Sequence, residues 1–309
     1  MSPMKWLQTG PDKLITRHFS GTNTQRERLE RPLRVAHLTD QHFGPATPHA
    51  LQCEAVERVN QAKPDLVLLT GDYVAHDLKH LDELQEVVAR IQGPTYAVLG
   101  NHDHWSGPRE VQRALERSNV EVLANQWTEV NVGGQRLQLV GVDDAFTGND
   151  DIEAATRGLN AAIPTIGLSH VGDGADQFWH RGVPLVLSGH THSGQFAVGG
   201  LEKWMMGRLA GHRFVHGLYG SRIQTEQTPE GIVYVSAGIG SSRFGLRVGE
   251  RARPEIAIFE LGRLPFEVPG DRSEQAPLHD RRFDLKTIER RHKDALKKQQ
   301  ARLRKHFGG

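Results

Sequence analysis

The sequence predicts an α/β fold built from two mixed sheets, and three observations support this. Continuously apolar runs such as residues 66–70 alternate with runs of helical spacing such as residues 50–62. Unbroken apolar runs are typical of parallel strands covered on both faces, with helices as crossovers. Gly, Pro and Asx residues separate the runs, as turns require. The second half is richer in short strands, and Gly133-Gly134 is a hairpin signal between two of them.

The first half of the chain is expected to alternate strands and helices. Strands are predicted over residues 33–40, 66–70 and 96–99, and helices over residues 50–62 and near residues 77–92. Pro64 follows the first helix and Pro94 the second, and both lie in turn signals. This order indicates parallel strands joined by crossover helices.

Short strands are predicted through the second half. They cover residues 121–124, 127–132, 136–142, 165–169, 184–188, 213–218, 232–236 and 255–261. Past about residue 263, Pro, Gly and charged residues replace the apolar pattern. We therefore divide the chain into an N-terminal extension (1–32), a main domain (33–263) and a basic tail, helical or flexible (264–309).

Chain length and cysteine usage bound the class of protein. A chain of 309 residues is long enough for one large domain with a substantial core. The single cysteine, Cys53, cannot form an internal disulfide, which indicates a reducing compartment. The sequence has neither a run of roughly 20 apolar residues, as a membrane span needs, nor the apolar stretch of an export signal. We therefore expect a soluble, cytoplasmic protein.

The charge is unevenly distributed. Residues 271–309 hold 12 Lys and Arg against 6 Asp and Glu, whereas the whole chain has a net charge of only +1. A basic segment of this kind can contact an anionic membrane surface or nucleic acid. A solvated extension is the favoured interpretation, with at most a weak peripheral membrane contact through the tail.

Five polar motifs follow apolar runs along the chain. They are Asp40-Gln41-His42, Gly71-Asp72, Gly100-Asn101-His102-Asp103, His170 and Gly189-His190-Thr191-His192. The carboxyl ends of parallel strands meet at one edge of a sheet, where open α/β sheets bind ligands. Carboxylates, an amide and several imidazoles suit divalent transition metals better than calcium or magnesium. The motifs therefore predict a metal site at that edge.

The spacing of the motifs indicates how metals can be held. In an extended segment, side chains two residues apart point the same way, so Asp40 and His42 can reach one ion. The two oxygens of the Asp72 carboxylate can bridge two cations. Two cations roughly 3.5–4 Å apart acidify a bridging water and clamp the attacking and leaving oxygens of a phosphoryl group. This arrangement predicts hydrolysis of a phosphoester.

In order and residue type, the motifs resemble the calcineurin-like metallophosphoesterases. The resemblance covers about residues 33–262 and implies that family's four-layer αββα sandwich. It implies that Asp40, His42 and His192 hold a first metal and that Asp72 bridges. It implies that Asn101, His170 and His190 hold a second. The metals allowed by this ligand set are Mn, Fe, Zn, Co and Ni, of which we favour Mn.

The resemblance also implies roles for two residues that are not ligands. His102 is expected to face the phosphate, to stabilise the transition state for in-line attack by the bridging hydroxide, and to protonate the leaving oxygen. Asp103 is expected to orient His102 by accepting its ring N–H.

A narrower similarity points to small bacterial phosphodiesterases, a branch that includes lipid-sugar nucleotide hydrolases. The matching stretches are residues 188–195, 217–219, 238–240 and 253–255. We therefore expect a phosphodiesterase acting on a nucleotide, sugar-nucleotide or lipid-linked substrate. Gln41 and His76 depart from that branch. Gln41 points away from its neighbours and should matter little, while His76 is either a surface residue, which we favour, or a substrate contact.

Other functions stay open on the same motifs. A nuclease or a nucleotide pyrophosphatase, including one of the UDP-diacylglucosamine type, could use the same site, and so could a non-catalytic metal-binding module. The full ligand set argues against the last of these. No interleaved aromatic and basic patch adjoins the motifs, so nucleic acid is not favoured. Asp72 is not followed by the Arg-Gly pair of protein phosphatases. The oligomeric state stays open.

Several further residues have two interpretations each. His37 is expected to be packed within its strand, and His104 to be at the rim of the site. His212 and His216 are expected to be strand residues rather than ligands. The cluster Trp204-Met205-Met206 is expected to pack in the core, with a groove for an apolar leaving group as the alternative.

Overall fold

The computed structural model describes residues 11–194, 206, 211–226, 228–241, 247–264, 268 and 274–279. Trp204 and Met205 lie outside these residues, so the expectation for their cluster is not addressed. The tail is described only at residues 264, 268 and 274–279. Within the described part of the chain, every helix is too short or too polar to cross a bilayer.

Two six-stranded sheets form the centre of the molecule. The order in the first sheet is β1 (Ile15–Ser20), β12 (Glu255–Leu261), β2 (Leu33–Leu38), β3 (Leu66–Thr70), β4 (Thr95–Val98) and β5 (Val120–Val122). The order in the second is β10 (Gly217–Ser221), β11 (Gly231–Val235), β9 (Leu185–Ser188), β8 (Thr165–Leu168), β7 (Gln135–Gly141) and β6 (Gln126–Val132). Both sheets are mixed: β12 is antiparallel to β2, and β10 and β6 are antiparallel to their neighbours.

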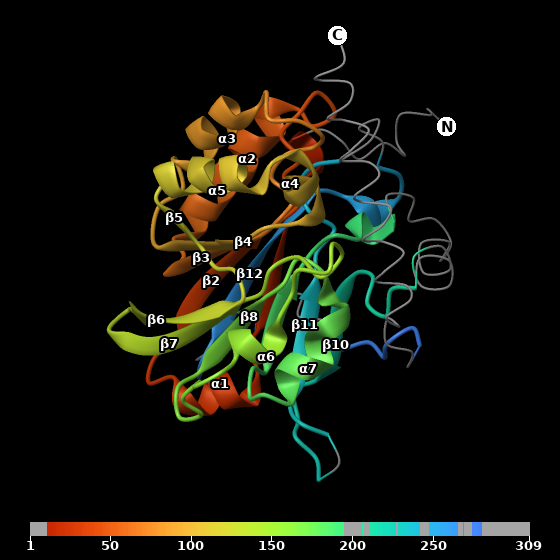
Figure 1. Cartoon of the computed structure of the whole chain (residues 1–309). Coiled ribbons are helices and arrows are strands. Elements are labelled where there is room, and N and C mark those ends of the chain that lie inside the picture. Colours follow the sequence, from red (N-terminus) through yellow and green to blue (C-terminus); the bar gives the residue numbers. More distant parts are fainter. Residues whose placement is uncertain are drawn as a thin grey trace.

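Helices cover the outer face of each sheet, which confirms the four-layer αββα sandwich (Figure 1). The first sheet is covered by α2 (His49–Ala62), α3 (Leu81–Val88) and α5 (Pro108–Arg117). The second sheet is covered by α6 (Ile152–Ala155) and α7 (Ala175–Trp179). Two further short helices are α1 (Asn23–Arg28) and α4 (Asn101–Ser106).

The unbroken apolar strands follow from this layering. In β3, Leu66 and Leu68 pack between the two sheets, whereas Val67 and Leu69 pack under the helices. Successive side chains of a strand point to opposite faces, so a strand covered on both faces must be apolar at every position. The parallel pairing of β2, β3 and β4 and the β6–β7 hairpin agree with the sequence prediction.

Two differences from the expected strands exceed two residues. Residues 15–20, which we assigned to the N-terminal extension, form β1 and pair in parallel with β12, so the first sheet reaches ahead of residue 33. The strand expected over residues 213–218 begins only at Gly217. Arg213 is instead tied to Asp173, whose Oδ1 accepts the Arg213 backbone N–H at 2.6 Å.

Part of the tail lies against the edge of the second sheet. The Gln275 N–H donates to the Leu218 carbonyl at 2.8 Å, and the Leu278 N–H donates to the Arg213 carbonyl at 2.9 Å. An ion pair joins Glu274 to Arg222 at 3.1 Å. The segment 274–278 therefore packs along β10.

Candidate metal centre

All five sequence motifs lie at the carboxyl ends of parallel strands. Asp40 and His42 follow β2, Asp72 follows β3, Asn101 begins α4 after β4, His170 follows β8, and the pair His190 and His192 follows β9. The polar residues that follow these strands, from both sheets, therefore lie together, as the sequence predicted.

The backbone at these strand ends is unusual. The residues with positive φ include Asp40 (52°), His42 (48°), Asp72 (56°), His190 (71°) and His192 (50°). Non-glycine residues rarely adopt this left-handed conformation, and such strain is concentrated at functional sites. Close packing also requires glycine at position 189, where a Cβ would overlap the Asp40 carboxylate.

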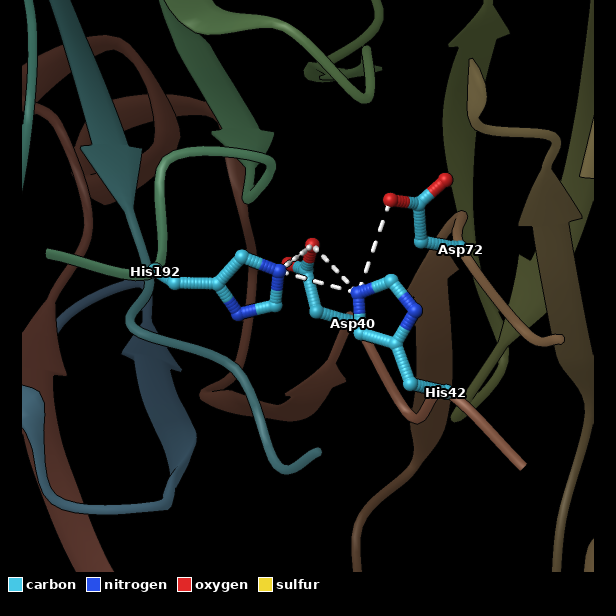
Figure 2. A group of neighbouring side chains, drawn as sticks. All are labelled: Asp40, His42, Asp72 and His192. Atoms are coloured by element: carbon cyan, nitrogen blue, oxygen red, sulfur yellow. Dashed lines mark hydrogen bonds and ion pairs between the residues drawn. The ribbon is translucent and has the colours of Figure 1, made fainter. Parts of the chain in front are cut away.

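A first cluster consists of Asp40, His42, Asp72 and His192, all buried, with their ligand atoms within 4.8 Å of one another (Figure 2). The two Nε2 atoms of His42 and His192 lie 2.9 Å apart. His192 Nε2 lies 3.3 Å from Asp40 Oδ1, and His42 Nε2 lies 3.6 Å from Asp72 Oδ2. Figure 2 shows dashed lines from the His42 ring nitrogen to both carboxylates.

A second cluster consists of Asp72, His170 and His190. His170 Nε2 lies 3.3 Å from Asp72 Oδ2 and 3.2 Å from His190 Nδ1. The Asp72 carboxylate thus belongs to both clusters.

The donor set fits divalent transition metal ions. Imidazole nitrogens and carboxylate oxygens converge at distances that a shared ion would explain. Two buried atoms at the site, Asn101 Oδ1 and His42 Nδ1, have no hydrogen-bond partner among the described residues. A buried amide oxygen without a donor is costly, which favours a cation as its partner.

Burial and mutual charge set the protonation of these groups. Burial lowers the pKa of His42 and His192 well below the ordinary value, so both rings are neutral, as metal ligation requires. Burial raises the pKa of Asp40 to about 7. For Asp72, burial opposes ionisation, but the charges of His170 and His102 hold its pKa well below the ordinary value.

Contacts behind the ligands fix their orientation. The His170 Nδ1–H donates to the Thr70 carbonyl at 2.7 Å, which turns Nε2 toward Asp72. The guanidinium of Arg247 is buried, donates to the carbonyls of Ala237 and Ala252, and places Nη2 3.2 Å from His192 Nδ1. Sequence reasoning missed Arg247, which lies outside the five polar motifs and carries no local signal.

His102 is beside the first cluster, with its ring centroid 4.8 Å from that of His42. Its backbone N–H donates to Asp72 Oδ1 at 2.8 Å, and its ring Nδ1 donates to the Ala75 carbonyl. Burial lowers the pKa of its ring below the ordinary value. With Nδ1 committed to a carbonyl, Nε2 is the nitrogen that can exchange a proton with a substrate.

The expected pairing of Asp103 with the His102 ring is wrong. Asp103 accepts backbone N–H groups instead, from Asp72, Tyr73, Val74 and Gly100 at 2.8–3.2 Å. The physical reason is that α4 begins at Asn101, which puts Asp103 at the third helical position. A carboxylate there turns back to cap its own helix. The sequence signal for this role was the position of Asp103, three residues after Gly100 at the start of a helix.

The other histidines that the sequence singled out belong to neither metal cluster. His104 Nε2 lies 2.6 Å from Asp143, and His76 is exposed with its ring 5.4 Å from that of His102. His212 and His216 pair with carboxylates at 2.6 and 3.1 Å and belong to neither cluster. His37 is buried in β2, as expected, with Nε2 2.8 Å from the Thr70 hydroxyl.

Comparison with known proteins places the chain in a family. The family model for calcineurin-like phosphoesterases matches residues 33–194. The phosphodiesterase YaeI of Escherichia coli (strain K12) is 30% identical over 238 residues, which are 74% of this chain and 82% of that protein. The chain therefore belongs to the calcineurin-like phosphoesterase family and is a phosphoester hydrolase, a family that uses divalent metal ions.

Two further relatives carry only general names. The uncharacterized metallophosphoesterase YkuE of Bacillus subtilis (strain 168) is 29% identical, with 66% of this chain and 70% of that protein covered. One from Helicobacter pylori (strain ATCC 700392 / 26695) is 31% identical, but the match spans only 61% of that protein. Among solved structures, a 5'-nucleotidase precursor from Thermus thermophilus is similar at 18% identity and a TM-score of 0.43, covering 73% of this chain and 56% of that one.

Proposed function

We propose that this chain is a phosphodiesterase with two metal ions. Asp40, His42 and His192 hold the first ion and Asn101, His170 and His190 the second, with Asp72 shared. The observation that carries the proposal is the membership of Asp72 in both clusters, each of which supplies further ligands on its own side. Among Mn, Fe, Zn, Co and Ni we favour Mn.

Divalent ions held there supply an acidified water and neutralise charge on the phosphoryl oxygens. The protein's own contribution is position and proton transfer. His102 keeps one ring proton on the Ala75 carbonyl, so its orientation is fixed before substrate binds. In its doubly protonated form the ring donates the Nε2 proton to the leaving oxygen; burial opposes that form, and the Asp72 charge offsets part of this cost.

The phosphodiester class is supported by the name of the Escherichia coli relative, a phosphodiesterase. Nucleotide pyrophosphatase or nuclease activity on the same site is the second candidate. Metal-reconstituted enzyme should hydrolyse bis-p-nitrophenyl phosphate faster than p-nitrophenyl phosphate. A preference for the monoester would overturn the proposal.

A variant pair separates chemistry from metal binding. His102→Ala should lower kcat by about 10²–10⁴-fold with metal content retained, which is the usual contribution of a positioned acid. His18→Ala is the matched control, because His18 is an exposed histidine on β1. Loss of metal in His102→Ala would make His102 a ligand instead.

Weak contact of the basic tail with anionic membranes is a separate proposal. A truncation after His279 keeps the segment that packs along β10 and removes most of the basic residues. The full chain should bind anionic vesicles and release them at high salt, whereas the truncated chain should not bind. Equal binding by both forms would reject this role.

A further inference from the structure

Two aromatic side chains that are not metal ligands adjoin the metal centre. Trp105 packs on His102 with ring centroids 5.0 Å apart, and Phe146 packs on His190 at 4.7 Å. Trp105 and Phe146 also contact each other edge to face, at 5.9 Å and 74°. The pair therefore spans from the proton-donating histidine to a ligand of the second cluster. We call Trp105 and Phe146 the aromatic wall.

The wall is held by its own contacts. Trp105 follows His102 by three residues on α4, so both side chains lie on one face of that helix. Phe146 is in a turn after β7 in which the Asp144 carboxylate accepts the Thr147 N–H at 2.7 Å. The short His104–Asp143 pair, at 2.6 Å, joins the segment of Trp105 to the segment of Phe146. The two rings are thus fixed relative to each other from both sides.

The aromatic wall lies where the leaving group of the substrate would be. In the proposed reaction His102 protonates the leaving oxygen, so the group attached to that oxygen is on the His102 side. Trp105 lies against that ring and Phe146 continues the surface toward His190. Both side chains are half-buried. Aromatic faces and edges favour another planar ring over a small alkyl or strongly polar group.

We propose that the aromatic wall selects phosphodiesters whose leaving group is an aromatic ring, the class of aryl esters. This inference rests on the proposed function, since it assumes that the phosphoryl group binds at the two clusters. Trp105 and Phe146 are specificity-determining residues here, with no part in proton transfer or metal binding.

Binding of two phosphonates to the manganese-loaded enzyme tests the wall. Phenylphosphonate and methylphosphonate share the anionic head and differ only in the group that would meet the wall. We expect calorimetry to give about tenfold tighter binding of phenylphosphonate, the effect of one or two good aromatic contacts. Trp105→Leu and Phe146→Leu, which keep an apolar side chain, should each reduce that preference about threefold or more.

Conservative variants guard against misfolding as the cause. Trp105→Phe and Phe146→Tyr keep a ring at each position and should keep most of the preference. Equal binding of the two phosphonates by the wild type, or an unchanged preference in both leucine variants, would overturn the wall. Binding of neither phosphonate would overturn the proposed function and the wall together. If the enzyme bound methylphosphonate as tightly as phenylphosphonate, the aromatic wall alone would be overturned.

Discussion

The variant Asp103→Asn distinguishes two roles for Asp103. It either holds neighbouring loops together through hydrogen bonds to their backbone N–H groups, a role we call the clamp, or it orients the His102 ring. In the structure one oxygen of Asp103 accepts the N–H groups of Asp72 and Gly100, and the other accepts those of Tyr73 and Val74. The side chain is fully buried. Burial and the Asp72 charge raise the pKa of Asp103 to about 7, while the four N–H donors favour its charged form.

The expected loss follows from the geometry. An asparagine keeps one acceptor oxygen but turns an NH₂ group toward the other two N–H donors, so two hydrogen bonds to a charged acceptor disappear. Each is worth about 1.5–3 kcal/mol, which gives a loss of about 3–6 kcal/mol in the free energy of unfolding. Because the clamped N–H groups flank Asp72 and Asn101, metal affinity should also fall, by about 10–100-fold.

Urea unfolding followed by circular dichroism, with chelator present, measures the first effect. Asp151→Asn is the matched control: Asp151 caps α6 at the surface, its Oδ1 accepting the Ala154 N–H, and asparagine caps as well as aspartate. The control should change stability by less than about 0.5 kcal/mol. If Asp103→Asn were as stable as the control and lowered only kcat, the clamp would be refuted and orientation of His102 restored.

Two further predictions test the surroundings of the site. Arg247→Met keeps the buried stem but removes the donor to two carbonyls and to His192, so it should lower stability by about 2–6 kcal/mol, about 1–3 kcal/mol for each carbonyl left without a donor. In a metal titration it should also weaken binding at the first cluster, which contains His192, far more than at the second. An equal loss of affinity at both clusters would contradict this. Burial lowers the pKa of His37 to about 3 from an ordinary 6.5, so its contribution to stability is complete above pH 6.5 and is lost as the pH falls toward 3. His37→Gln should therefore remove about 1.6 kcal/mol of the stability loss between pH 6.5 and pH 5, as measured by urea unfolding at the two pH values; identical pH slopes for wild type and variant would exclude it.

The layers and the place of the site could be predicted because their signals are local. Runs such as residues 66–70 are apolar at every position, which is the requirement of a strand covered on both faces, and polar residues follow directly after them. Parallel pairing then brings the strand ends together whatever the details of the loops. The grouping of Asp40, His42, Asp72 and His192 is a consequence of that topology.

What could not be predicted depends on partners distant in the sequence. The pairing of β1 with β12 joins residues 15–20 to residues 255–260 and has no local signal. Phe214 and Val215 read as a strand, yet the adjoining Arg213 is bound by Asp173 and the chain does not pair until Gly217. For Asp103, the direction of the side chain depended on where α4 begins, a boundary that sequence patterns define poorly.

The shared position of Asp72 is tested most directly by elemental analysis of purified, reconstituted protein. The wild type should contain two divalent ions per chain, one for each cluster. Asp72→Asn, which keeps the shape of the side chain but loses the bridging charge, should lower occupancy at both sites and abolish diester hydrolysis. One ion per chain in the wild type, or two ions retained in Asp72→Asn, would contradict a centre built around this carboxylate.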